Sequence, residues 1–112
     1  MIDLFVYGTL QDHMVQQSLI GRMIDGAKDT LEDYTINTVL MPPYPVAVPK
    51  DGGRIDGQVL IITQDELTTL DAYEGECYLR IRVWLVSGRE AWVYIVNPAC
   101  YPDEDFAISQ MD

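Results

Sequence analysis

Two short segments of the sequence carry residues whose types and spacing fit anion binding and proton transfer. The first is Tyr7-Gly8-Thr9-Leu10, at the point where an alternating strand pattern stops and a helical pattern begins. Glycine lets the backbone turn with its amides exposed, and amides at such a turn can bind an anion. A glycine that ends a strand is also common in ordinary turns, so this segment alone leaves both interpretations open.

The second segment runs from Leu70 to Glu76, and the residue in it that could transfer a proton is Glu74. Glu74 lies between Tyr73 and Gly75, in what the pattern predicts is a loop after a short helix. A carboxyl that is partly removed from water there would have a raised pKa, which suits a proton shuttle near neutral pH. The alternative is a solvated glutamate, because charged residues are mostly exposed.

A strand and a short helix are predicted around the first segment. Apolar residues alternate over residues 2–7, and the strand that they predict ends at Gly8. Asp12 is a suitable N-terminal cap for a helix, and Gly21 is a suitable stop. The candidate anion-binding turn is therefore expected to join the first strand to the first helix.

The middle of the chain is predicted to contain an extended loop and then a hairpin. Four prolines lie close together here, namely Pro42, Pro43, Pro45 and Pro49. They argue against a helix or a central strand and favour a rigid extended loop. The Asp-Gly-Gly sequence at 51–53 is typical of a tight turn, and residues 54–61 alternate after it as a strand does.

A second helix and a strand pair are predicted in the last third of the chain. Thr63 and Glu66 form a capping-box signature for a helix that should end near Ala72. Residues 78–87 and 91–96 alternate as two strands joined by a short turn. The resulting order, β-α-β-β-α-β-β, predicts an α+β fold: a small mixed or antiparallel, barrel-like β domain with two or so short helices.

The sequence shows neither an internal repeat nor a linker that would divide it. We therefore expect residues 1–112 to form one domain, with a core of about residues 2–97 and an acidic C-terminal tail over 98–112. Of the residues, 48% are apolar, which is too many for a disordered chain.

The chain is strongly acidic, with 18 acidic residues, 7 basic residues and a net charge of −11. A surface with that charge repels phosphate backbones and anionic lipids, so nucleic acid and membranes are not expected as partners. A protein whose acidic surface recruits a basic partner is one alternative that the composition leaves open. The oligomeric state does not follow from the sequence.

Metal ligands are too few for a structural zinc site, since the sequence offers only Cys77, Cys100 and His13. Asp3 stands where a secretory signal would be basic, and the N-terminal apolar run is too short for a membrane span. We therefore expect a cytoplasmic protein without a metal or another cofactor. In a reducing compartment the two cysteines are expected to be free thiols, unless the fold brings them close together.

Taken together and in this order, the two segments resemble the gamma-glutamylcyclotransferase-like family, including its small gamma-glutamylamine cyclotransferase-like members. That family has a strand-ending YG(S/T)L turn and a later LDxxEG segment followed by Y-x-R. The matching positions here are Tyr7 to Leu10, Leu70 to Gly75, and Tyr78 with Arg80. The resemblance continues through the proline-rich loop at 44–49 and the strand at 57–59, so it covers roughly residues 2–96.

This resemblance implies an enzyme that cyclises a gamma-glutamyl group to 5-oxoproline and releases an amine, without a cofactor. It implies that Glu74 is the acid/base residue and that backbone amides of the first turn hold the carboxylate of a small-molecule substrate. The implied substrate-binding residues are Tyr7, Gly8, Thr9, Leu10, Tyr78 and Arg80. Tyr78 or Thr9 is a candidate second donor for the oxyanion, and Arg80 is expected to pair with nearby acids or with a substrate carboxylate.

One feature keeps another interpretation open. Asp12 places a negative charge beside the proposed carboxylate site, which weakens binding unless its side chain caps the helix instead, the role that we expect. A non-catalytic module that holds a small carboxylate in the same pocket is the main alternative to an enzyme.

Overall fold

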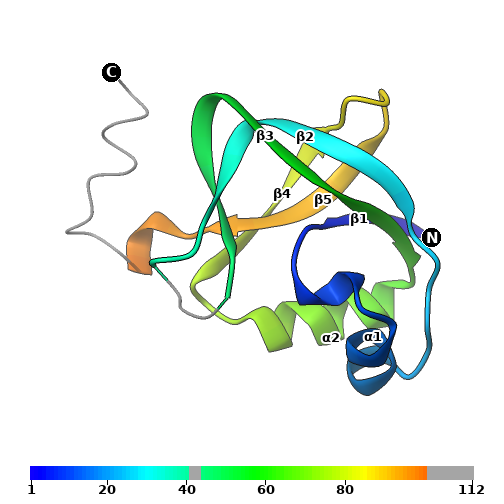
Figure 1. Ribbon diagram of the computed structural model, residues 1–112. Coiled ribbons are helices and arrows are strands. Elements are labelled where there is room, and N and C mark those ends of the chain that lie inside the picture. The colour runs from blue at the N-terminus through cyan, green and yellow to red at the C-terminus, as the bar shows by residue number, and fades with distance from the viewer. Residues whose placement is uncertain (41–43, 101–112) are drawn as a thin grey trace.

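The computed structural model describes residues 1–40 and 44–100, and it has the element order that the sequence predicts (Figure 1). The strands are β1 (Ile2–Val6), β2 (Ala27–Asn37), β3 (Val46–Ile62), β4 (Tyr78–Trp84) and β5 (Glu90–Val96). The helices are α1 (His13–Ile20) and α2 (Gln64–Glu74), with short 3-10 turns η1 (Thr9–Gln11) and η2 (Pro98–Cys100). The predicted α+β class and order of strands and helices are confirmed.

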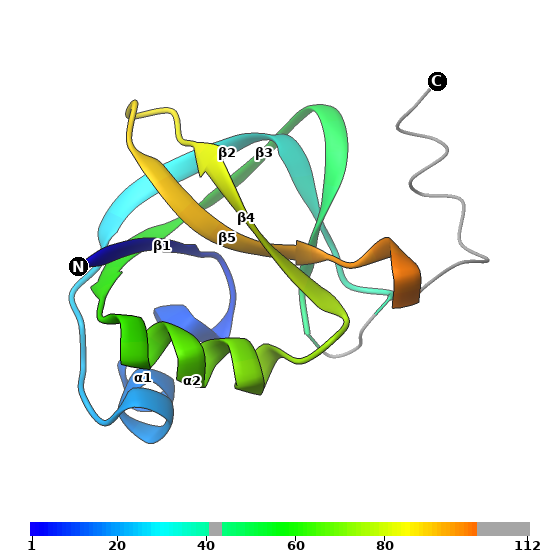
Figure 2. The same cartoon turned by 180° about the vertical axis from the view of Figure 1, so that it is seen from behind.

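The strands form one curled five-stranded sheet in the order β2-β3-β1-β5-β4. Neighbours in this order are antiparallel except β1 and β5, and β3 also meets β5 in a parallel pairing of Ala47 with Ile95. The sheet is curled so strongly that the Val86 N–H, just after β4, donates to the Thr30 carbonyl of β2 at 2.9 Å. The result is a half-barrel with both helices on one side, below β1 in Figures 1 and 2.

β1 runs between two halves of the hydrophobic core, because its side chains alternate as predicted. Leu4 and Val6 pack with Leu67 and Leu70 of α2. Phe5 packs on the opposite face, inside the curl of the sheet. All three β1 side chains are at most 4% exposed, so the turn that follows starts from a fixed strand.

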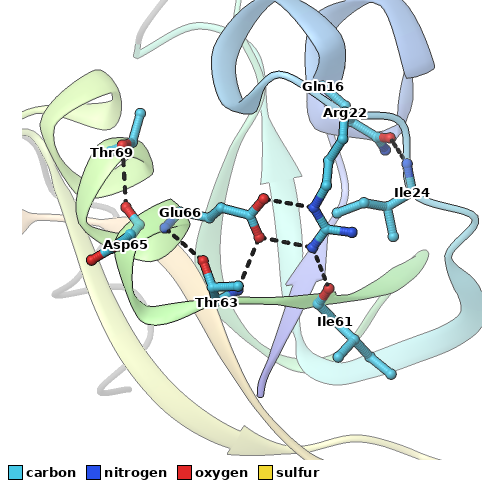
Figure 3. Close-up of polar contacts among 8 residues, drawn as sticks. All are labelled: Gln16, Arg22, Ile24, Ile61, Thr63, Asp65, Glu66 and Thr69. Carbon is cyan, nitrogen blue, oxygen red and sulfur yellow. Dashed lines mark hydrogen bonds and ion pairs between the residues drawn. The ribbon is translucent and has the colours of Figure 1, made fainter.

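Both helices begin with the caps that the sequence predicts. The Asp12 carboxylate accepts a backbone N–H of the first turn at 2.7 Å, and Gly21, at φ 76°, ends α1. Thr63 and Glu66 form the reciprocal capping box of α2. Arg22 holds Glu66 through two bonds of 2.6 and 2.8 Å, as Figure 3 shows, and so fixes the start of α2 to the segment that leaves α1.

The second helix is longer than predicted and contains Glu74. It ends where Gly75 takes a φ of 80°, a conformation that favours glycine, and donates its N–H to the Asp71 carbonyl at 3.2 Å. The expectation that the helix ends near Ala72, with Glu74 in a loop, is therefore wrong. Glu74 lies on the last turn of a helix whose Leu70 is fully buried.

β2 and β3 pair antiparallel up to Asn37 and Val46, and Pro45 precedes β3 as expected for a loop, but the tight turn expected at 51–53 is wrong. β3 is continuous and pairs with β2 on both sides of the Asp-Gly-Gly segment at 51–53. Residues 50–53 form a bulge opposite the single β2 residue Asp33, which has a φ of 69° and accepts the Gly52 N–H at 3.1 Å. Pro49 is tolerated in the strand because it lies beside this bulge. Two of the four prolines lie outside the described residues.

Cys77 and Cys100 form a disulfide, so the expectation of two free thiols is wrong. The antiparallel pairing of Tyr78 with Val96 brings the start of β4 beside the end of β5. The Asn97 N–H then donates to the Cys77 carbonyl at 3.0 Å, and the two cysteines meet. The cysteines therefore no longer support a reducing compartment, and the cytoplasmic location stays a prediction.

None of the helices among residues 1–40 and 44–100 has the length and apolar character that a membrane span needs. The division into a core and a tail over residues 98–112 stays a prediction, since most of that tail lies outside the described residues. Its first part, η2, is fastened to the core by the disulfide.

Candidate functional site

A cavity of about 260 Å³ brings the two predicted segments together, between the end of β1 and the end of α2. Its lining comprises Phe5, Val6, Tyr7, Gly8, Thr9, Leu10, Tyr44, Pro45, Tyr73, Glu74, Tyr78 and Tyr94. Every residue predicted for the site belongs to this lining except Arg80. A mostly apolar wall with a few polar groups is typical of small-molecule sites.

The turn that ends β1 forms part of the cavity lining, over residues 7–10. The chain passes from Gly8 directly into η1, where the Gly8 and Thr9 carbonyls accept the N–H groups of Gln11 at 3.1 Å and Asp12 at 2.9 Å. The first N–H groups of a helical turn have no acceptor within it, so those of Thr9 and Leu10 can donate to a bound anion. The Asp12 carboxylate caps α1 and is therefore engaged beside this turn, as predicted.

A buried glutamine fixes the inner side of the same turn. Gln16 of α1 is 0% exposed, and its Nε2 donates to the Leu10 carbonyl at 2.8 Å. Its Oε1 accepts the Ile24 N–H at 2.7 Å, a contact visible in Figure 3. Gln16 was not predicted as part of the site, because glutamine in a short helix is normally exposed and nothing in the local pattern marks it as buried.

Pro45 forms one wall of the cavity, and Gly8 and Tyr78 both approach it closely. A Cβ atom at Gly8 would lie 3.2 Å from the Pro45 Cγ, so the absence of a side chain at Gly8 allows this close approach. The Tyr78 hydroxyl donates to the Pro45 carbonyl at 3.0 Å. These contacts connect the β1 turn, the start of β3 and the start of β4 around one opening.

Glu74 is the carboxyl of the cavity lining. Within residues 1–40 and 44–100 its side chain makes no hydrogen bond or ion pair, so nothing offsets its removal from water. Burial raises the pKa of Glu74 from 4.5 to about 7. A carboxyl with a pKa near neutrality can take up and release a proton at the same site, which agrees with the role predicted for Glu74.

Tyr7 lines the cavity but uses its hydroxyl to hold the fold. That hydroxyl donates to the Tyr94 carbonyl at 2.6 Å and accepts the Ala47 N–H at 3.0 Å. Burial raises the pKa of Tyr7 well above its ordinary value, with a smaller contribution from nearby Glu74. Tyr7 therefore stays protonated and joins β1, β3 and β5 at the point where the cavity begins.

Arg80 lies behind the cavity rather than in its lining. Its guanidinium forms a two-bond ion pair with Asp71, at 2.8 and 3.0 Å, and stacks over the Trp92 ring at 4.2 Å. Partial burial would raise the pKa of Asp71, but its hydrogen bonds from Arg80 and from the Tyr94 hydroxyl hold that pKa below the ordinary value. Of the two roles expected for Arg80, the geometry favours pairing with a nearby acid.

Several lining residues were not predicted as site residues. Tyr44 and Tyr73 are about half exposed at the cavity, and Tyr94 is buried within it. The available signal was the high number of tyrosines, 7 in 112 residues, but it does not indicate which of them converge. Among the described residues no cluster of three or more His, Cys, Asp or Glu could hold a metal ion, and no Lys or Arg lines this cavity.

The family model described as gamma-glutamyl cyclotransferase, AIG2-like, matches residues 4–111. The chain belongs to this family. The resemblance found in the two motifs is thereby confirmed, and the family's fold and its use of a small-molecule pocket agree with the cavity described above.

Two relatives from Arabidopsis thaliana give the scale of the similarity. AIG2-like protein A is 36% identical over 85 residues, which are 75% of this chain and 52% of that protein. AIG2-like protein C is 33% identical over 114 residues, covering 93% of this chain and 66% of that protein. The chain thus spans between half and two thirds of the length of these two relatives.

Solved structures share the fold. The solution structure of At5g39720.1 from Arabidopsis thaliana has a TM-score of 0.77 and 28% identity, covering 98% of this chain and 80% of that chain. A structure named gamma-glutamyl cyclotransferase has a TM-score of 0.73 at 16% identity, covering 86% of this chain and 66% of that chain. At that identity the second comparison concerns the fold alone.

Proposed function

We propose that this protein cyclises a gamma-glutamyl amine, or a related small molecule, to 5-oxoproline and releases the amine. The observation that carries this proposal is the shared cavity, which is lined both by the turn at 7–10 and by the Glu74 carboxyl, which has no polar partner among the described residues. Membership of the gamma-glutamyl cyclotransferase, AIG2-like family supports the same type of reaction.

The proposed reaction is intramolecular, so the protein has to hold one folded conformer of its substrate. The substrate α-nitrogen forms a bond with the γ-carbonyl carbon, and the bond from that carbon to the departing amine then breaks. Bringing the two groups together within one bound molecule supplies a large part of the rate. The products are 5-oxoproline and the amine, and neither water nor a cofactor is consumed.

Glu74 acts in both proton transfers of this scheme. Its carboxylate takes a proton from the α-ammonium group, which makes the nitrogen nucleophilic. The resulting carboxylic acid gives that proton to the departing nitrogen as its bond to carbon breaks, so the enzyme returns to its starting state. The second proton that the attacking nitrogen loses as the lactam forms is taken up by the released amine, which leaves as an ammonium ion. The raised pKa, about 7, makes both directions of transfer accessible near neutral pH.

The substrate α-carboxylate binds at the β1 turn in this proposal. The amides of Thr9 and Leu10 are the donors, and Tyr7 and Gly8 shape the turn around them. Of the two candidate oxyanion donors, the hydroxyl of Tyr78 already donates to a carbonyl. The Thr9 side chain is exposed and makes no hydrogen bond within the described part of the chain, so it is the less committed donor.

A product assay tests the proposal. The wild-type protein is incubated with a panel of gamma-glutamyl amines and gamma-glutamyl amino acids, and 5-oxoproline is measured by mass spectrometry. We expect product from at least one compound and a rate roughly 10²–10⁴-fold lower in the E74Q variant, which keeps the side-chain volume but cannot titrate. The matched control is E76Q, because Glu76 is exposed just beyond the helix and is not part of the cavity.

The same panel separates an enzyme from a binding module. If no compound yields 5-oxoproline, the proposed reaction is contradicted. A rise in melting temperature with an unconsumed gamma-glutamyl ligand would then identify a small-carboxylate-binding protein of the same fold.

A further inference from the structure

Four side chains form a continuous series of contacts behind the cavity wall. Asp71 Oδ1 accepts hydrogen bonds from Arg80 Nε at 2.8 Å and from the Tyr94 hydroxyl at 2.7 Å. Asp71 Oδ2 accepts a third bond, from Arg80 Nη2, at 3.0 Å. The guanidinium of Arg80 lies over the ring of Trp92 at 4.2 Å, and this stacking fixes the plane of the guanidinium.

These contacts join three elements at the place where Glu74 is held. Asp71 lies on α2 one turn before Glu74, Arg80 is on β4, and Tyr94 is on β5 and lines the cavity. Since Glu74 makes no polar contact of its own within the described residues, its position depends on the last turn of α2. The Asp71 carboxylate is the polar link between that turn and the sheet.

An ion pair that is partly open to water contributes little to stability, so stability alone does not account for the arrangement of Asp71 and Arg80. The Asp71 and Arg80 side chains are 39% and 24% exposed. Two hydrogen bonds join them, and the Arg80 guanidinium also stacks on the Trp92 ring. This combination restricts the relative orientation of the two side chains. A restricted geometry is useful where a reacting carboxyl must stay in place, because a displacement of about 1 Å can cost up to ~10²-fold in rate.

We propose that Asp71 and Arg80 are positioning residues. Together they hold the last turn of α2 beside Tyr94 of β5, so that the Glu74 side chain stays in the cavity. In this role Arg80 acts through Asp71 and does not bind the substrate. The inference rests on the proposed function and assigns to the pair a part in that reaction.

Kinetics of single and double variants separate positioning from substrate binding. We expect D71N and R80Q each to lower kcat by about 10- to 100-fold with little change in KM. The double variant should be no worse than the poorer single variant, because both changes remove one interaction. R80K should recover part of the lost kcat, since lysine keeps the positive charge but cannot form the two parallel hydrogen bonds of the guanidinium.

Arg82 provides the matched control for this series. It lies on the same strand and over the same Trp92 ring at 5.2 Å, but it pairs with Glu90 and does not contact Asp71. R82Q should therefore leave kcat unchanged. A raised KM in R80Q with normal kinetics in D71N would show that Arg80 binds substrate, and additive losses or no loss of kcat would also overturn the proposal.

A second measurement does not depend on activity. Carboxyl NMR gives the pKa of Glu74 in the wild type and in D71N/R80Q, which removes one positive and one negative charge together. We expect the pKa to fall from about 7 toward 4.5, because a released helix end lets water reach the carboxyl. The neighbouring phenols of Tyr7 and Tyr94 stay neutral over this range.

The two readouts distinguish the two proposals. An unchanged Glu74 pKa in the folded double variant would overturn the positioning role, whatever the activity. If the pKa falls as expected but the wild-type protein forms no 5-oxoproline, the positioning of Glu74 stands and the proposed reaction fails.

Discussion

The two ends of α2 carry glutamates in opposite states. At the first turn, hydrogen bonds from Arg22, and then from Thr63, lower the pKa of Glu66 to about 2. At the last turn, burial raises the pKa of Glu74 to about 7, and its carboxyl has no polar partner in the part of the chain that the structure describes. The residue type and the helix are the same, so the difference comes from what surrounds each carboxyl. A carboxylate saturated with donors holds structure together, whereas one without donors is available for chemistry.

The sequence context of each end agrees with this division. Glu66 lies in the first turn, where a negative charge favours the helix dipole, and it completes the capping box. Glu74 lies in the last turn, which contains no basic residue and where a negative charge is unfavourable. The chain therefore carries a local cost at Glu74, for which the proposed catalytic role would account.

The largest expected contrast between the two glutamates is in the pH dependence of activity. Since Glu74 must be ionised to act as a base, kcat/KM for a turned-over substrate should fall by ~50-fold between pH 7 and pH 5, approaching about tenfold per pH unit well below pH 7. Stopped assays over that range measure it. E66Q should show the same profile, and a profile that is flat down to pH 5 would contradict the role of Glu74.

The next largest effect concerns the disulfide just beyond the Glu74 end. The Cys77–Cys100 link spans 23 residues, and serine at both positions should lower the free energy of unfolding by about 3 kcal/mol. Denaturant melts of the variant and the oxidised wild type give the difference. Amide exchange should quicken around residues 75–78 but not at the Thr63 cap, and a loss of protection at both ends of α2 would show that they are not independent.

Removing the titrating group of Glu74 should stabilise the protein at high pH. The folded pKa is raised above 4.5, so the contribution of Glu74 to stability is fully present below 4.5 and is lost as pH rises through about 7. E74Q avoids that loss and should be more stable than the wild type by roughly 1–3 kcal/mol at pH 8, with little difference at pH 4. Urea melts at both values test this, and an E74Q variant less stable at pH 8 would contradict it.

The smallest effect is expected for Glu66, at the start of α2. Its contribution to stability changes with pH in the direction opposite to that of Glu74. Glu66 has a pKa lowered from 4.5 to about 2, so its stabilising contribution is present above 4.5 and is lost as pH falls toward 2. E66Q should lower the free energy of unfolding by about 1 kcal/mol at pH 7, mainly through the weakened cap. The difference should disappear near pH 2, and a difference that persists there would assign it to packing instead.

Local signals in the sequence predicted the parts of the fold that local chemistry determines. The caps at Asp12, Thr63 and Gly21 depend only on neighbouring residues, and all three are confirmed. The convergence of Glu74 with the turn at 7–10 is different, because no spacing in the chain indicates it. It was predicted from the resemblance to a family and agrees with the cavity.

The predictions that failed depend on contacts between distant residues. The disulfide forms because β4 and β5 pair in register, and Pro49 enters a strand because Asp33, on the neighbouring strand, makes a bulge there. The contact of Asp71 with Arg80 and Tyr94 was out of reach for the same reason, since it needs the packing of α2 on the sheet.

The arrangement of the site is tested most directly by a crystal structure of the E74Q variant with a bound gamma-glutamyl amine. The account predicts that the substrate α-carboxylate accepts hydrogen bonds from the amides of Thr9 and Leu10, and that the α-nitrogen lies within hydrogen-bond distance of the substituted side chain at position 74. A ligand bound in the cavity with its α-nitrogen turned away from α2, or bound elsewhere on the protein, would contradict it.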